Sequence, residues 1–157
     1  MNLQTINDRG SERMNEVYGP SLLPKVFNSY GAHKEDFKFN EFFAVYGIYL
    51  SDFEVITSLE AEAVVYSSIS CLGLKGPSAW HLRGMGRLLG ARGTSNDTEQ
   101  IKAISSQLEN LKRAVIRVVD FAGEESRRRA GCDEWAGVDD IVGQLGGWGE
   151  DKFVPAA

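Results

Sequence analysis

Apolar residues recur at steps of three and four positions between Thr98 and Phe121, and this run constrains the fold more than any other feature of the chain. The stripe consists of Ile101, Ile104, Leu108, Leu111, Val115, Ile116 and Val119. Such spacing lines one face of an α-helix of about six turns, whereas a strand would alternate in steps of two. The segment therefore predicts a long amphipathic helix, with Gly123 as its terminator.

Other segments also favour helices. Apolar spacing and helix-ending residues predict them over 11–18, 21–30, 41–49, 57–71, 77–89 and 133–145. Residues 33–40 are expected to be a polar connection and 148–157 a tail. Residues 90–97 are expected to be a loop, in which Thr94, Ser95 or Asp97 caps the next helix. The predicted fold is all-α, a helical bundle without strands.

The segment 41–49 is rich in aromatic residues, so a strand is also possible there. A helix is favoured because one helical face would collect Phe42, Val45, Tyr46 and Tyr49. This apolar surface and the stripe on 98–121 exceed what one small subunit readily covers, which predicts a homo-oligomer.

Two helices joined by a short turn form the centre of the predicted bundle. Thr57 and Glu60 make a Thr-x-x-Glu capping box that starts the first helix. Residues 72–76 are expected to be the turn, and Pro77 suits the first position of the second helix. Packed as a hairpin, the two helices would bring Glu62 and His81 together at the base of one pocket.

A carboxylate beside an imidazole is a pair of groups suited to proton transfer. An imidazole of ordinary pKa, about 6.5, can act as acid or base near neutrality. Glu62 is costly to bury unless it is paired, so it either faces solvent or pairs with His81 or an arginine. We predict His81 and Glu62 as catalytic residues, although a lone histidine on an apolar helix is commonly a structural residue.

Four further residues are candidates for binding a substrate. Arg83 suits a carboxylate, but it diverges from His81 by about 200° on a helix and could instead bind a partner subunit or a helix end. Tyr66 and Tyr46 could hold a substrate oxygen or shape an aromatic pocket, and Trp80 could pack in the core or at an interface. Cys71 is interpreted as a small buried residue, since the sequence shows no neighbouring base.

Composition narrows the classes of partner. The chain of 157 residues has a net charge of −5 and a pI near 5.1, which argues against nucleic acid or an anionic membrane as the main partner. Its basic run, residues 127–129, is expected to be a solvated helix face. No apolar segment approaches about 18 residues, so neither a membrane span nor a signal peptide is expected.

Cysteine and histidine usage points to a reducing compartment. Cys71 and Cys132 stand far apart, outside any Cys-x-x-Cys pair, which fits a cytoplasmic protein. The two histidines, His33 and His81, lack metal-ligand spacing, so no metal site is expected. The glycines at 84, 86 and 90 do not have dinucleotide-binding spacing, and they are expected to allow close helix packing.

Four short segments in a fixed order resemble the carboxymuconolactone decarboxylase family of the alkylhydroperoxidase D-like superfamily. They are Leu-Glu-Ala-Glu-Ala at 59–63, Trp-His-Leu-Arg-Gly at 80–84, Gly-Ala-Arg-Gly-Thr at 90–94 and Thr-Glu-Gln-Ile at 98–101. The separation of 19 residues between Glu62 and His81 is shared with the family. The resemblance covers about residues 46–108.

This resemblance implies an all-helical subunit that assembles into trimers or hexamers, with pockets near subunit contacts. It implies one domain over 1–157, with a core at 42–121 and a helical extension at 122–157. It also implies cofactor-free chemistry, with an imidazole and a carboxylate moving protons. The peroxidase branch has a Cys-x-x-Cys just before the histidine, but the matching positions here are Leu74 and Pro77.

The leading hypothesis is an acid–base enzyme acting on a small cyclic acid, a lactone or an enolisable ketone. Its reaction would be decarboxylation, lactone or ring rearrangement, or isomerisation, in aromatic degradation or natural-product biosynthesis. The substrate would be a carboxylate, a lactone or a polyketide-like molecule. The rival is a non-catalytic oligomeric helical protein that binds a ligand or partner. A single-cysteine peroxidase using Cys71 is the weakest alternative.

Overall fold

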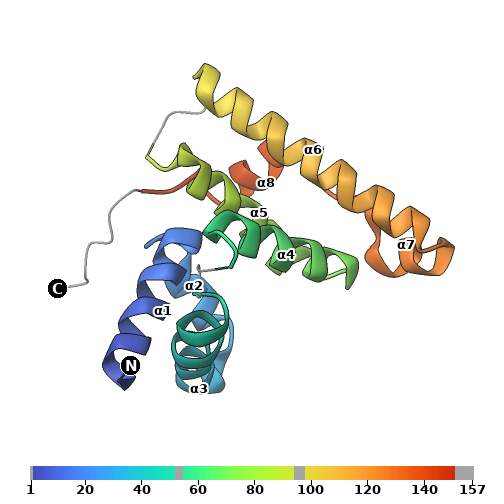
Figure 1. Cartoon of the computed structure of the whole chain (residues 1–157). Coiled ribbons are helices and arrows are strands. Elements are labelled where there is room, and N and C mark those ends of the chain that lie inside the picture. Colours follow the sequence, from blue (N-terminus) through green and yellow to red (C-terminus); the bar gives the residue numbers. More distant parts are fainter. Residues whose placement is uncertain (1, 52–54, 94–97, 151–157) are drawn as a thin grey trace.

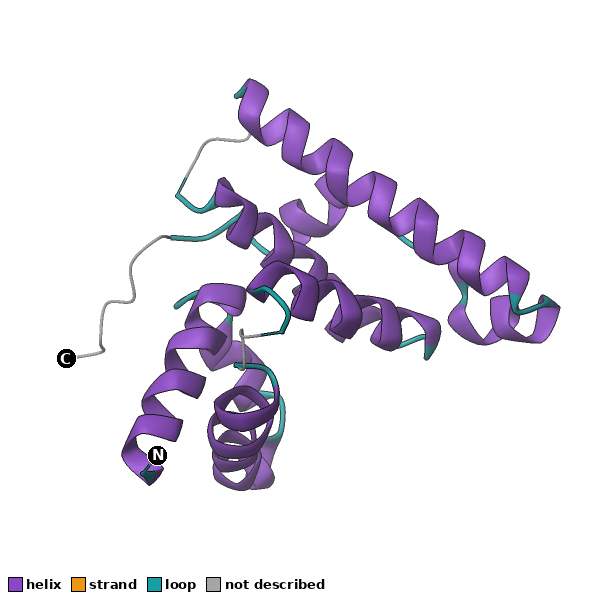
Figure 2. Cartoon of the chain, viewed as in Figure 1, coloured by secondary structure: helices purple, strands orange, loops and turns teal. Residues whose placement is uncertain are grey.

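The computed structural model describes residues 2–51, 55–93 and 98–150, and every regular element in these ranges is a helix (Figure 2). The α-helices are α1 (Leu3–Tyr18), α2 (Leu23–Asn28), α3 (Lys34–Asn40), α4 (Ser58–Cys71), α5 (Lys75–Gly86), α6 (Glu99–Phe121), α7 (Glu124–Ala130) and α8 (Val138–Gln144). Two π-helical segments, η2 (Glu41–Tyr49) and η3 (Arg87–Ala91), and two 3₁₀ turns, η1 (Gly31–His33) and η4 (Cys132–Glu134), complete the list. The all-α prediction is confirmed.

The hairpin of α4 and α5 lies at the centre of the molecule (Figure 1). On one side, α1, α2, α3 and η2 form an N-terminal group around a small core that includes Met14, Val17 and Phe27. On the other side, α6, α7 and α8 cover the hairpin over a larger core that includes Leu82 and Leu108. Each face of the hairpin therefore packs against a different part of the chain.

The start of α4 follows the predicted capping chemistry. Glu60 N donates to Thr57 Oγ1 over 3.2 Å, and Thr57 N donates to Glu60 Oε2 over 2.7 Å. These two bonds satisfy backbone donors that a helix start leaves without partners. Helix α5 begins at Lys75, two residues before the predicted start, so Pro77 still lies in the first turn where its missing N–H has no cost.

The N-terminal third is more helical than the apolar pattern indicates. Helix α1 begins at Leu3 rather than at residue 11, because the Asn2 side chain caps it by accepting from Thr5 N over 2.8 Å. Residues 33–40, expected to be a connection, contain helix α3, which Phe37 anchors against Phe27. Helix α2 is shorter than the predicted 21–30. The capping side chain and the aromatic contact favour helix where the sequence spacing does not.

The aromatic segment is helical, but its faces differ from the prediction. In η2 the hydrogen bonds span five residues, as in the bond from Leu50 N to Val45 O. Successive residues of a π-helix turn by less than those of an α-helix. Tyr46 is consequently buried, whereas Tyr49 is 76% exposed and does not share its face.

The C-terminal third also departs from the prediction. Helix α6 is confirmed, with Thr98 as its cap, whereas the predicted caps at positions 94, 95 and 97 lie outside the described residues. The helix predicted over 133–145 is limited to α8. Trp148, expected in a tail, is buried against Gly86, where an added Cβ would lie 2.0 Å from the indole. The absence of a side chain at Gly86 admits this ring.

Two arginines, Arg83 of α5 and Arg87 of η3, join the end of α1 to residues 147–150, and we call this pair the arginine clamp. Arg83 donates to the carbonyl oxygens of Tyr18, over 2.8 Å, and Gly147, over 2.6 Å. Arg87 donates to those of Asn15, Glu16, Trp148 and Glu150. Cations are favourable at a helix C-terminus, where carbonyl groups lack helical partners. The clamp therefore fixes the last turn of α1.

The basic run at residues 127–129 lies at the surface on α7, as predicted. Arg128 is exposed and pairs with Glu125 one turn earlier, while Arg127 pairs with Asp120 and Asp133. Within the described ranges, none of the helices combines the length and the apolar character needed to cross a bilayer.

Candidate functional site

The predicted meeting of Glu62 and His81 is confirmed. Glu62 Oε2, on α4, lies 2.8 Å from His81 Nδ1, on α5, and both side chains are buried. An ionised carboxylate can only accept, so in a neutral imidazole paired with it Nδ1 carries the proton and Nε2 has the lone pair. The pair thus fixes both the orientation and the tautomer of the imidazole.

The second carboxylate oxygen of Glu62 faces Arg13 on α1. Arg13 Nη2 lies 3.5 Å from Glu62 Oε1 and donates to the carbonyl of Ser58 over 2.7 Å. Both side chains are almost fully buried, so the guanidinium offsets the charge of a carboxylate that would otherwise be costly to bury. Sequence reasoning missed Arg13, although it lies one helical turn before Val17, on the buried face of α1.

Nε2 of His81 faces a pair of tyrosines. The Tyr18 hydroxyl lies 3.2 Å from His81 Nε2 and 3.0 Å from the Tyr46 hydroxyl. Burial raises the pKa of both phenols well above their usual value, so both hydroxyls keep their protons near neutrality. Tyr46 was predicted, whereas Tyr18 was missed; its position one turn after Met14 on an apolar face was the available signal.

These groups lie on the wall of a cavity of about 300 Å³ between the hairpin and the N-terminal group. Its polar lining comprises Tyr18, Tyr30, Glu41, Tyr46 and His81. The remaining walls are apolar and include the predicted residue Trp80. None of the described residues that line this cavity is a lysine or an arginine.

Glu41, at the start of η2, brings a carboxylate to the lining of this cavity and was not predicted. Burial raises its pKa, and the positive charge of a protonated His81 acts in the opposite direction. A carboxyl whose pKa is raised releases its proton closer to neutrality. Glu41 can therefore bind or release a proton opposite the imidazole.

Two predicted substrate residues lie elsewhere. Arg83 belongs to the arginine clamp, and burial lowers its pKa to about 10. Its side chain diverges from His81, as the helical geometry predicts, and it does not line the His81 cavity. Tyr66, one turn after Glu62, faces the other side of the hairpin and lines a separate cavity. The structure thus brings together His81, Glu62, Tyr46 and Trp80, but not Arg83 or Tyr66.

Neither cysteine lies on the His81 cavity. Cys71 packs at the edge of the larger core, and burial raises the pKa of the Cys132 thiol. In the part of the chain that the structure describes, no group of three or more His, Cys, Asp or Glu side chains gathers in a metal-binding arrangement.

Taken in order, Arg13, Glu62, His81, Tyr18 and Tyr46 form one continuous chain of polar contacts from a buried cation to a cavity wall. The chain can accept a proton at the imidazole and stabilise the resulting charge through Glu62. It can also donate hydrogen bonds from two neutral phenols to an oxygen in the cavity.

Comparisons with protein-family models, curated proteins and solved structures return no match to this chain.

Proposed function

We propose that this chain is a cofactor-independent acid–base enzyme that moves a proton on a neutral enolisable ketone or lactone. The observation that carries the proposal is His81, which is held between Glu62 and the Tyr18 hydroxyl on the wall of a largely apolar cavity. Titratable side chains that contact one another beside a cavity are candidates for a functional site, because they can pass or stabilise a proton there.

The proposed base is Nε2 of His81. A substrate oxygen that takes the hydrogen bond of Tyr18 frees the Nε2 lone pair, which then accepts a proton from the carbon next to the substrate carbonyl. The C–H electron pair forms a C=C bond to the carbonyl carbon, and the π electrons of the C=O bond move to oxygen, which gives an enolate. Glu62 accepts the hydrogen bond from Nδ1 and offsets the positive charge of the imidazolium, and Arg13 contacts the other carboxylate oxygen of Glu62.

The two phenols are the proposed donors to the enolate oxygen. Tyr18 and Tyr46 lie 3.0 Å apart at their hydroxyls and remain protonated, because burial raises the pKa of each. Donors fixed before reaction in a cavity with apolar walls stabilise developing negative charge more strongly than water does. Returning the proton from Nε2 to another carbon of the enolate completes an isomerisation.

The lining favours a neutral substrate over an acid. Glu41 contributes a carboxylate, and no lysine or arginine among the described lining residues offers a counter-charge. Aromatic and aliphatic side chains form most of the wall, which suits a cyclic or polyketide-like molecule. The resemblance to carboxymuconolactone decarboxylases supports proton transfer and a homo-oligomeric enzyme, while the missing counter-charge argues against a carboxylate as the bound form.

The test is carbon-bound hydrogen exchange, which needs no knowledge of the complete reaction. A panel of cyclic ketones and lactones is incubated with the protein in D₂O, and deuterium incorporation is followed by NMR. Exchange catalysed by the native protein should fall by about 10²–10⁴-fold in His81→Gln. His33→Gln is the matched control because His33 is exposed at the surface. Equal exchange in native protein and His81→Gln would refute the proposal.

A second candidate is a non-catalytic protein that binds a neutral apolar ligand in the same cavity. It is favoured by the fact that both ring nitrogens of His81 already have partners, as in a structural histidine. In that case His81→Gln would lower the melting temperature, and ligands that bind the cavity would show no exchange. The two candidates therefore separate in one experiment.

A further inference from the structure

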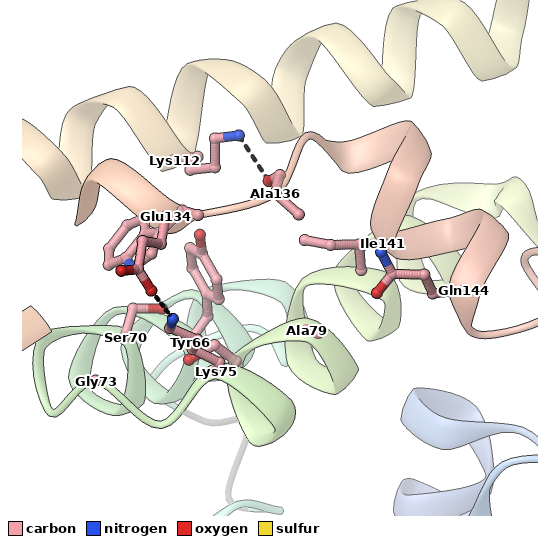
Figure 3. A pocket seen from close by; sticks show the side chains of 12 residues that line it. Tyr66, Ser70, Gly73, Lys75, Ala79, Lys112, Glu134, Ala136, Ile141 and Gln144 are labelled. Atoms are coloured by element: carbon pink, nitrogen blue, oxygen red, sulfur yellow. Dashed lines mark hydrogen bonds and ion pairs between the residues drawn. The ribbon is translucent and has the colours of Figure 1, made fainter. Parts of the chain in front are cut away.

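A second cavity lies on the opposite face of the hairpin, and the proposed function does not use it. Its volume is about 240 Å³ (Figure 3). Tyr66 and Ser70 of α4 line it, whereas their chain neighbours Val65 and Ile69 line the His81 cavity. The far walls come from α6, α8 and residues 134–136, all of which belong to the C-terminal third of the chain.

Two hydroxyl groups in this cavity are available to a ligand. Ser70 Oγ is buried, and among the described residues its contact with the Tyr66 hydroxyl does not have the geometry of a regular hydrogen bond. Tyr66 rises from α4 toward the segment at Ala136 (Figure 3). Burial raises the pKa of Tyr66 to about 12, against a smaller opposing effect of the Ser70 hydroxyl, so the phenol is a neutral donor. A buried hydroxyl without a partner destabilises the protein, and a ligand that accepts its proton recovers this cost.

Lys112 of α6 brings a cation to the same cavity. Its side chain is 11% exposed, and Nζ donates to Ala136 O over 2.9 Å and pairs with Glu109 Oε2 at 3.0 Å. An ammonium has three N–H donors, and these contacts go to two groups. Nζ also lies 3.3 Å from Glu109 Oε1, so its three N–H donors face three oxygen atoms, and a ligand carboxylate would share the ammonium with Glu109.

The remaining wall is flat and apolar. Trp135 satisfies its indole N–H at the carbonyl of Ala130 over 3.0 Å, which leaves the ring as a nonpolar surface. Ala79 and Ile141 add apolar atoms. At the surface, Lys75 pairs with Glu134, so the lining holds two cations and one anion.

We infer that this cavity binds a small aromatic carboxylate, with its carboxylate at Lys112, Tyr66 and Ser70 and its ring against Trp135. The difference between the two cavities supports this assignment, because the described lining of the His81 cavity includes Glu41 and neither lysine nor arginine. The site stands independently of the proposed enzymatic activity.

The experiment is a titration with benzoate, followed by calorimetry and by NMR shifts of side-chain resonances. Benzoate is expected to bind with a Kd of roughly 0.1–1 mM, as suits a ligand of this size. Benzamide, its neutral analogue, should bind about fivefold or more weakly because charged hydrogen bonds are the stronger ones. Tyr66→Phe and Ser70→Ala should each weaken benzoate binding by about threefold to tenfold.

Matched controls separate this site from its surroundings. Ser68→Ala removes an exposed hydroxyl of the same helix, which donates to Val64 O, and should leave the Kd unchanged. His81→Gln should also keep benzoate binding, whether or not it affects turnover. Tyr66→Phe keeps the ring, and its melting curve verifies the fold.

Three results would overturn the inference. The first is no saturable benzoate binding up to about 20 mM, well above the expected range. The second is equal affinity for benzoate and benzamide. The third is binding that Tyr46→Phe weakens while Tyr66→Phe does not, since this would put the ligand in the His81 cavity.

Discussion

Gly84 of α5 packs directly against Val17 of α1: a Cβ added at Gly84 would lie 2.5 Å from Val17 Cγ1 and 3.2 Å from the Val17 carbonyl oxygen. This contact sets how closely the N-terminal helix approaches the hairpin. Because Tyr18 follows Val17 and meets His81 three residues before Gly84, one glycine controls whether the tyrosine and the imidazole reach each other.

Gly84→Ala should therefore lower the free energy of unfolding by about 1–3 kcal/mol, since overpacking forces the two helices apart. Chemical denaturation measures the loss. Gly76→Ala is the matched control, because Gly76 is in the same helix with nothing within 4 Å of an added Cβ, and it should be neutral or slightly stabilising. Equal stability of the two variants would contradict the close approach.

Glu62→Gln should cost about 3 kcal/mol of stability near neutral pH. The substitution removes the only charge in contact with both Arg13 and His81 among the described residues, and it leaves a buried guanidinium with less compensation. Glu12→Gln, at an exposed position of α1, should change stability by less than about 0.5 kcal/mol. A neutral effect of Glu62→Gln would mean that Arg13 does not depend on this carboxylate.

Alkaline pH should destabilise the fold through its buried tyrosines. A phenol with a raised pKa stabilises the native state fully below its unfolded pKa of about 10, and this contribution is lost as the pH rises toward the folded value. Burial raises the pKa of Tyr18 and Tyr46, and that of Tyr66 to about 12. Tyrosinate absorbance should therefore develop together with unfolding for these residues.

Tyr66→Phe isolates one of these contributions. Between neutrality and a pH of about 11, its loss of stability should be smaller than that of the native protein by about 1 kcal/mol, the linkage expected from a pKa near 12. Tyr49→Phe serves as the control because Tyr49 is exposed, and it should follow the native curve. Coincident curves for Tyr66→Phe and the native protein would contradict the burial effect.

Arg83→Met should act on stability and leave the KM of a turned-over substrate nearly unchanged. The guanidinium donates hydrogen bonds to two backbone carbonyl groups. Removing both bonds leaves these carbonyl groups without that donor and should cost roughly 2–4 kcal/mol of stability. Arg128→Met removes an exposed arginine and should be close to neutral. A large rise in KM at unchanged stability would instead restore a substrate-binding role for Arg83.

We expect a homo-oligomer because large apolar side chains are left at the surface. Phe121 is 95% exposed at the end of α6 and Val118 is 64% exposed one turn earlier, while Tyr49 is largely exposed on η2. Analytical ultracentrifugation measures the mass, and Phe121→Asp should shift it toward smaller species. A monomer at micromolar concentration would contradict the prediction.

The features that could be predicted from the sequence depend on residues close together along the chain. The capping box at Thr57 and the long stripe of α6 depend on residues a few positions apart, and both are confirmed. The register of α4 then determines the side on which Glu62 lies, so its meeting with His81 could be predicted from two helices and a short turn. Local signals were sufficient wherever a single hairpin was involved.

Contacts between distant segments could not be predicted in this way. Arg13 and Tyr18 come from α1, 49 and 63 positions before their partners Glu62 and His81, and no local pattern relates these pairs. The π-helical turn of η2 changes which aromatic residues are buried, and intrinsic preferences do not reveal it. Tyr66 lies one turn after Glu62, so the sequence predicts that it shares a pocket with His81. The structure instead places Tyr66 on a separate cavity on the other side of the hairpin.

The arginine clamp also has a consequence for the order in which this protein can mature during synthesis. Tyr18 leaves the ribosome well before the carbonyl groups at positions 147, 148 and 150, which the clamp also engages. Until those residues are made, Arg83 and Arg87 hold only one of the two segments that they join. A nascent chain should therefore acquire its central hairpin first and a correctly seated Tyr18 only after residues 147–150 have been made.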